Sequence, residues 1–201
     1  MPLARVFRAP TLALAACLLV AACAIDPSAP AIKPVARQAA ESFLLTGRLS
    51  ATDGEHSATG RLEWQHRPSA DRWTVLSPLG QIVARIEEGP EGASLTLSNG
   101  ERRYAAQAAE LMSGLFPGIV DAGLPPARLA VWIQAAPPAD AEIRTLDAQG
   151  RPVRAIDQGW IIDYLAYRDE TPVAPPRLLD IFRGDFRLRL AIDQWETPWA
   201  P

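Results

Sequence analysis

The sequence predicts a mainly β protein in which about eleven antiparallel strands curl into a barrel or half-barrel, with about three short helices. Apolar and polar residues alternate with a period of two over much of residues 43–195. Turn-forming pairs such as Asp53-Gly54 and Asn99-Gly100 separate these runs at short intervals. Both observations favour a meander of half-buried strands over a parallel sheet with crossover helices.

The first two strands show this pattern most clearly. Residues 43–51 carry apolar or small side chains at the odd positions and mainly polar ones at the even positions. Asp53-Gly54 then predicts a tight hairpin, because both residues tolerate positive φ. The return strand, residues 56–66, alternates in the same way. Its inward residues are Ala58, Gly60, Leu62 and Trp64.

Nine further strands follow, separated by glycine- and proline-rich turns. They are expected at residues 72–77, 82–88, 93–98, 101–105, 142–147, 152–157, 159–168, 177–183 and 186–195. Helical spacing of apolar residues predicts three short helices between or before them. These lie within residues 34–42, 108–115 and 126–136. The last is opened and closed by proline pairs.

The N-terminus has the three parts of a secretory signal. Arg5 and Arg8 form a positive region, and residues 11–22 are uncharged, apolar and too few to span a bilayer. The end of this run and the next residue, Val-Ala-Ala-Cys at 20–23, resemble the lipobox of bacterial lipoproteins. This resemblance implies that residues 1–22 are a cleaved signal peptide and that Cys23 receives a diacylglycerol and an N-acyl chain. The alternative is that Cys23 is a small buried residue beside an ordinary cleavage site.

Cleavage leaves about 180 residues, the size of one domain. Residues 23–42 are expected to form the lipidated N-terminus, tether and short helix, and residues 43–201 the folded domain. Cys17 lies in the discarded segment, so the mature chain has no second cysteine for an internal disulfide. The next residue, Ala24, is not the aspartate that favours inner-membrane retention of Gram-negative lipoproteins. By resemblance to that rule, the outer membrane is the expected location.

Charge and composition exclude several classes of function. The formal net charge is −3, and removal of two arginines with the signal makes it about −5. This argues against nucleic acid as a partner and against electrostatic attachment to anionic membranes. Six tryptophans suit either a large core or an apolar ligand site.

Signatures of catalysis and metal binding are missing. The two histidines, His56 and His66, are ten residues apart on one expected strand, roughly 33 Å if it is extended. They cannot share a metal ion within one monomer. No nucleophile elbow or phosphate-binding glycine loop is present. We therefore expect no catalytic residues, no metal and no cofactor beyond the lipid on Cys23.

The loop Ser77-Pro78-Leu79-Gly80-Gln81 joins two expected strands and places a leucine at its tip. Burying one leucine in a membrane contributes about 1.5–3 kcal/mol, enough for a transient contact but not for an anchor. The pattern alone leaves two alternatives open: Leu79 contacts a membrane, or it folds back onto the core.

Several short motifs together resemble the LolB family of outer-membrane lipoprotein receptors. The resemblance spans about residues 43–195, and it is specific through the order and spacing of motifs that are individually weak. The motifs are Thr46-Gly47-Arg48, Gly60-Arg61-Leu62-Glu63-Trp64, Ser77-Pro78-Leu79-Gly80, Leu129-Ala130-Val131-Trp132-Ile133, Gly159-Trp160 with Tyr164 and Tyr167, and a last strand ending at Trp195. One departure is a shorter segment between Cys23 and the first strand.

This resemblance implies an open antiparallel half-barrel of eleven strands, lidded by three helices and enclosing an apolar cavity. The family takes acylated lipoproteins from the periplasmic carrier LolA and inserts them into the outer membrane, with Leu79 as the membrane-insertion residue. The expected acyl-chain contacts are Leu49, Leu62, Trp64, Val75, Leu111, Trp132, Trp160 and Leu190. We expect a monomer whose partners are LolA, the acyl chains of its cargo and the outer membrane.

Two other functions remain open at this point. An outer-membrane lipoprotein could bind a different apolar ligand or scaffold envelope assembly, and Leu79 would then be dispensable. A lipid hydrolase would require a serine or an acid pair converging in the cavity.

Overall fold

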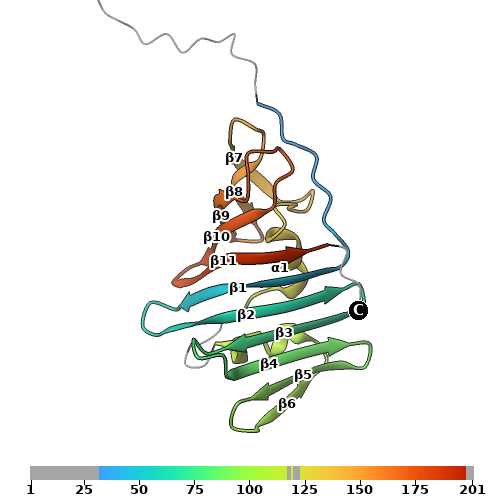
Figure 1. The fold of residues 1–201 in the computed structure, drawn as a ribbon, viewed down its shortest axis with the longest axis vertical. Coiled ribbons are helices and arrows are strands. Elements are labelled where there is room, and N and C mark those ends of the chain that lie inside the picture. Colours follow the sequence, from blue (N-terminus) through green and yellow to red (C-terminus); the bar gives the residue numbers. More distant parts are fainter. Residues whose placement is uncertain (1–31, 117–118, 120–122, 198–201) are drawn as a thin grey trace, which may run out of the picture. The chain divides into compact units, whose positions relative to one another are not determined.

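The computed structural model describes residues 32–116, 119 and 123–197, which contain one antiparallel sheet of eleven strands (Figure 1). The sheet is not closed, because β6 and β7 are its two unpaired edges. The spatial order is β6-β5-β4-β3-β2-β1-β11-β10-β9-β8-β7. The strands are β1 Phe43–Thr52, β2 Ser57–Arg67, β3 Ala70–Leu76, β4 Ile82–Gly89, β5 Gly92–Leu97, β6 Arg102–Ala105, β7 Glu142–Leu146, β8 Pro152–Asp157, β9 Trp160–Tyr167, β10 Pro176–Arg183 and β11 Phe186–Glu196. The predicted open, mainly β fold is confirmed.

The first and last strands, β1 and β11, pair at the centre of the sheet. Their register shifts between Thr46 and Gly47, where a bulge interrupts the ladder. A Cβ on Gly47 would lie 2.5 Å from the backbone oxygen of Ala191, closer than a side-chain carbon can approach. Glycine therefore allows the central strands to approach each other at this bulge.

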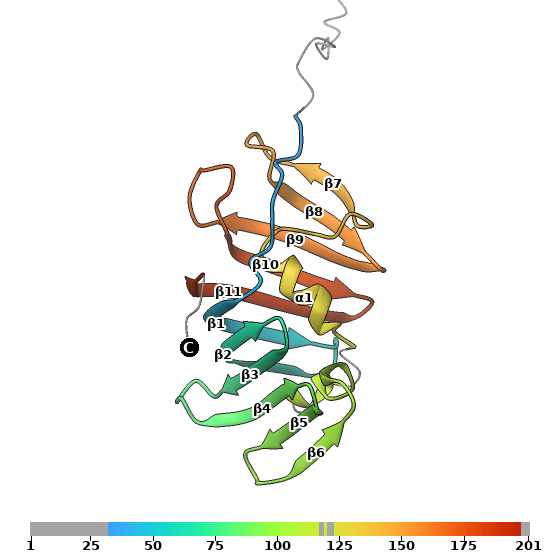
Figure 2. The ribbon, with the colours of Figure 1, turned by 90° about the vertical axis from the view of Figure 1, so that its right-hand side faces the viewer.

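Three short helical segments cover the concave face of the sheet. They are the 3₁₀ turns η1 (Ala108–Glu110) and η2 (Met112–Leu115) and the α-helix α1 (Pro126–Trp132). In Figure 2, α1 lies in front of the central strands. Proline opens α1, as predicted, since its missing N–H has no intrahelical partner at that position. We refer to η1, η2, α1 and the described residues between them as the lid.

The short helix predicted over residues 34–42 was wrong. These residues are extended and form a strap along the sheet and lid. The Val35 N–H donates to Gly150 O, and the backbone of Ala40 exchanges two hydrogen bonds with the Gln134 side chain. A helix of nine residues is marginal in water, so these tertiary contacts determine the conformation.

The strands and lid enclose one continuous apolar core. Its largest fully buried side chains are Trp64, Trp73, Trp132 and Trp160. The compact unit that contains this core begins at Ile32. Within residues 32–116, 119 and 123–197, none of the helices has the length and apolar character needed to span a membrane. The predicted signal peptide, Cys23 and Ala24 lie outside the described residues.

Candidate functional site

The loop between β3 and β4 is a tight turn that presents Leu79 to solvent. The Gly80 N–H donates to Ser77 O, and the Ser77 N–H donates to Gln81 O, both at 2.8 Å. Gly80 has a φ of 83°, a conformation that glycine adopts without strain. Leu79 is 89% exposed, so it does not fold back onto the core. An apolar side chain therefore projects from a turn whose backbone is held by internal hydrogen bonds.

The interior between sheet and lid is apolar but almost full. It contains a cavity of about 20 Å³, which is room for about one water molecule. The described residues that line it are all apolar: Leu49, Leu62, Trp64, Trp73, Val75, Met112, Leu115, Phe116, Leu124, Leu129, Leu188 and Leu190. Typical ligand pockets measure about 300–1,000 Å³, so this closed interior has no space for an acyl chain.

Five of the eight predicted cavity residues line this space: Leu49, Leu62, Trp64, Val75 and Leu190. The other three, Leu111, Trp132 and Trp160, are buried elsewhere in the same core. Trp132 and Trp160 pack against each other with ring centroids 5.9 Å apart. Trp132 lies outside the lining because its indole turns towards β8, where Asp157 accepts its hydrogen bond.

Sequence reasoning missed the other seven lining residues. Trp73 and Leu188 follow the strand alternation and could have been included on that basis. Met112 and Leu115 belong to the helical spacing that predicted a lid segment. Leu129 belongs to the helical spacing that predicted the helix within residues 126–136, whereas Phe116 and Leu124 reach the cavity through lid geometry that no period in the sequence indicates.

The α1 part of the lid is fixed to the sheet by polar contacts around Asp157. This carboxylate at the end of β8 is only 2% exposed and accepts a 2.7 Å hydrogen bond from Trp132 Nε1. Arg128 of α1 donates to Asp157 and also to Asp140. The hydrogen bond from Arg128 holds the pKa of Asp140 below its ordinary value. The buried charge is thus paired, as burial requires.

A tyrosine fixes the other end of α1. Tyr164 on β9 donates its hydroxyl to Trp132 O at 2.9 Å. Burial raises the pKa of Tyr164, which keeps the hydroxyl neutral and able to donate. By contrast, η1 contacts the sheet through its first N–H, which donates to the Glu88 carboxylate. Both ends of α1 therefore have polar attachments to the sheet.

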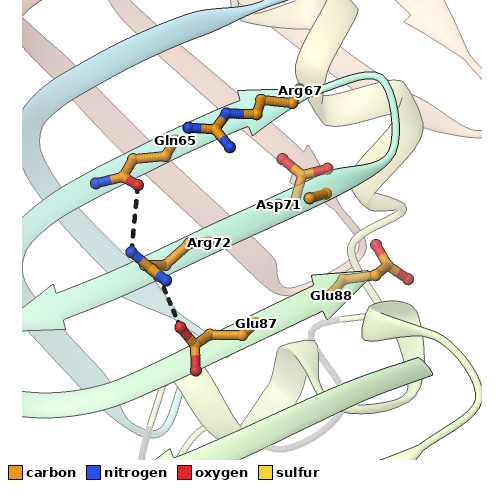
Figure 3. Close-up of a pocket in the computed structure, with 7 residues that line it drawn as sticks. Gln65, Arg67, Asp71, Arg72, Glu87 and Glu88 are labelled. Atoms are coloured by element: carbon orange, nitrogen blue, oxygen red, sulfur yellow. Dashed lines mark hydrogen bonds and ion pairs between the residues drawn. The ribbon is translucent and has the colours of Figure 1, made fainter. Parts of the chain in front are cut away.

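A polar surface pocket of about 170 Å³ lies where β2 ends, β3 begins and β4 ends (Figure 3). Its acidic side chains already have partners. Glu87 pairs with Arg72 at 2.7 Å, Glu88 accepts from η1, and Asp71 accepts from Trp64 Nε1 and lies 2.8 Å from His66 Nδ1. These contacts stabilise the rim of the sheet.

The described residues that line the cavity include no nucleophile, general acid or base. Among the described residues, no three His, Cys, Asp or Glu side chains are grouped to hold a metal ion. His56 precedes β2 and His66 lies near its end. An apolar ligand could contact these side chains only if the lid side chains moved out of the interior.

Comparison with known proteins identifies the family. The model of the family described as "Outer membrane lipoprotein LolB" matches residues 41–195. The outer-membrane lipoprotein LolB of Azoarcus sp. strain BH72 is 50% identical over 185 residues, which cover 92% of this chain and 93% of that protein. The LolB of Thiobacillus denitrificans is 38% identical over 159 residues, or 79% and 82% of the two chains.

A crystal structure of a LolA superfamily protein from Nitrosomonas europaea aligns over 83% of this chain and 90% of its own, with 8% identity and a TM-score of 0.49. The assignment rests on the sequence matches, which span nearly the whole described domain. The chain therefore belongs to the LolB family of outer-membrane lipoproteins.

Proposed function

We propose that this protein is a monomeric receptor that accepts the acyl chains of lipoproteins from LolA and passes them into the outer membrane. Its own anchor is the lipid on Cys23. The observation that carries the proposal is an interior whose described lining residues are all apolar, beneath a lid, in a fold that also projects Leu79 into solvent. Membership of the LolB family supports it.

The energetics explain why such a receptor needs no catalytic residues. Each buried CH₂ of an acyl chain contributes about 0.8 kcal/mol, so a chain of about fifteen such groups contributes roughly 12 kcal/mol. A lipoprotein with three such chains cannot cross water unaided. The receptor lowers this desolvation barrier by offering apolar contacts, and no covalent bond changes.

Cargo enters by displacing lid side chains. The lid contributes Met112, Leu115, Phe116, Leu124 and Leu129 to the lining, and they fill the space that an acyl chain needs. An entering chain replaces their contacts with the sheet by contacts of the same apolar kind, which offsets the free energy of opening. Because α1 is fixed by Asp157 and Tyr164, we assign this movement to η2 and to Phe116, which follows it.

A two-step transfer assay tests the proposal. Residues 24–201, which retain the compact unit, are mixed with LolA loaded with a lipoprotein, and outer-membrane vesicles are then added. Wild type and Leu79→Glu should both take cargo, but only wild type should deliver it, because a carboxylate is costly to bury in a membrane. Leu165→Glu, at an exposed leucine on β9, is the matched control and should deliver cargo normally.

Failure of wild type to take cargo from LolA would contradict the proposal. The leading account would then be a lipoprotein that binds another apolar ligand or scaffolds envelope assembly. Equal delivery by Leu79→Glu and wild type would leave cargo acceptance standing but remove the role assigned to Leu79.

A further inference from the structure

A groove of about 360 Å³ lies on the outer side of the sheet next to the Leu79 loop. Pro78, the neighbour of Leu79, forms part of its wall, and residues of β1 and β2 together with Asp193 of β11 form the rest. Arg48, Thr59 and Arg61 line it and are solvent-exposed on the face opposite the lid. Cationic and hydroxyl donors therefore lie beside the apolar residue proposed to enter a membrane.

The two arginines in this groove face each other. Arg48 of β1 is directly opposite Arg61 of β2 in the antiparallel register. Like charges at such a position destabilise a sheet, since their Cβ atoms are only about 4.5–5.5 Å apart. Asp193 relieves one of them by a two-point ion pair with Arg48, at 3.0 and 3.2 Å.

Arg61 has no such relief. It makes no side-chain hydrogen bond or ion pair with any residue that the structure describes, and Glu63, two positions along the same face, does not pair with it either. Three other arginines of the outer face do have an acid on the neighbouring strand: Arg72 has Glu87, Arg154 has Asp163 and Arg189 has Asp180. The sheet thus leaves an uncompensated cation next to its exposed loop.

We propose that this groove binds the phosphate of a phospholipid headgroup, with Arg61 as the main contact and Arg48 and Thr59 as supporting donors. An arginine presents a planar fork that matches phosphate oxygens. A phosphate between Arg61 and Arg48 would remove the repulsion within the sheet. This proposal rests on the membrane contact proposed for Leu79. The Leu79 side chain would reach the acyl chains of the bilayer, and Arg61 would lie at the depth of the phospholipid headgroups. The negative net charge of the chain is no obstacle, because the attraction is local.

Vesicle binding tests the site without cargo. The chain from residue 24 is titrated with vesicles of phosphatidylethanolamine and phosphatidylglycerol, and separately with vesicles of a galactolipid that has no phosphate. Arg61→Gln should weaken binding to the phospholipid vesicles about fivefold, the equivalent of ~1 kcal/mol, and leave galactolipid binding unchanged. Arg61→Lys should retain part of the affinity, because it keeps the charge but loses the fork. Arg102→Gln, at an exposed arginine on edge strand β6 with no ion pair to a described residue, is the matched control and should bind as wild type.

Three results would overturn the inference. The first is that Arg61→Gln binds phospholipid vesicles as tightly as wild type, and the second is that Arg102→Gln loses as much affinity as Arg61→Gln. The third is that Arg61→Gln weakens the binding of free inorganic phosphate, measured by NMR, but leaves the binding of phospholipid vesicles unchanged. Failure of the proposed function is distinguishable, because cargo acceptance from LolA is measured without vesicles. A wild-type protein that refuses cargo yet binds phospholipid through Arg61 would contradict the receptor role and support this site.

Discussion

Two buried tryptophans show how differently one residue type can contribute to this fold. Trp132 donates its indole N–H to the buried carboxylate of Asp157. The indole N–H of Trp73 is also buried, but it has no partner among the described residues. The first indole therefore satisfies a charge that would otherwise be costly, whereas the second carries an unmet polar group into the core.

Replacing each tryptophan by phenylalanine should separate these effects. Trp132→Phe should lower the free energy of unfolding by about 1–3 kcal/mol more than Trp73→Phe, because only the former leaves Asp157 short of a donor. Both lose a similar amount of aromatic surface, so the difference reports the hydrogen bond lost at Asp157 together with the unpaired N–H removed at Trp73. Urea unfolding of the two variants measures it, and equal losses would show that the Asp157 contact contributes nothing to stability.

The glycine at the central bulge makes a second residue-level prediction. Gly47→Ala should destabilise the fold by about 1–3 kcal/mol, the usual cost of overpacking, since its Cβ would meet the backbone of Ala191. Gly89→Ala is the control, because nothing lies within 4 Å of the Cβ it would carry. Thermal unfolding that finds the two substitutions alike would contradict this interpretation of the bulge.

The lid is the element on which function is proposed to depend, and Phe116 is its largest side chain in the cavity lining. Phe116→Ala should cost about 3–5 kcal/mol of stability and should bind a fatty acid more tightly than wild type, because less apolar volume must then leave. Phe43→Ala, at a buried phenylalanine outside the cavity lining, should lose stability without that gain. Fluorescent fatty-acid titration compares them, and weaker binding by Phe116→Ala would argue against displacement of the lid.

Strands were predictable from the sequence to within one or two residues, because most of them bury one face and so alternate visibly. The edge strands β6 and β7 are exposed along nearly all of their length, and the turn residues beside them indicated their positions. The lid and strap were not. Val35, Ala39 and Phe43 have helical spacing, yet contacts with Gly150 and Gln134, more than ninety residues away, keep the strap extended. Arg37, for which the sequence predicted no role, donates to the carbonyls of Pro172 and Ala174 and so joins the strap to the loop after β9.

The candidate site was predictable in part for the same physical reason. Leu49, Leu62, Trp64, Val75 and Leu190 were found because strand alternation indicates which side chains point inward. Whether a lid closes on them depends on packing between segments distant in sequence, which local periodicity does not encode. The unpaired charge of Arg61 likewise became visible only when the register placed it opposite Arg48.

Stability of the whole molecule should respond to ligands that fill its interior. A ligand that binds only the folded state raises its stability with concentration, by about 2.7 kcal/mol at one hundred times the dissociation constant. Palmitate should therefore raise the unfolding midpoint, and octanoate at the same concentration should not, because each missing CH₂ removes about 0.8 kcal/mol of affinity. A scan that shows equal shifts for both acids would place their binding on the surface.

Pairing of β1 with β11 has a consequence for the timing of folding. A chain that emerges N-terminus first, from a ribosome or through a membrane, can form the hairpins of β2 to β6 early. The pairing of β1 with β11 must wait for residues 186–196, which follow all the other strands in the chain. Pairings between such distant segments also form slowly. The centre of the sheet cannot form before β11 has emerged, which suits a protein that must stay unfolded while it is exported.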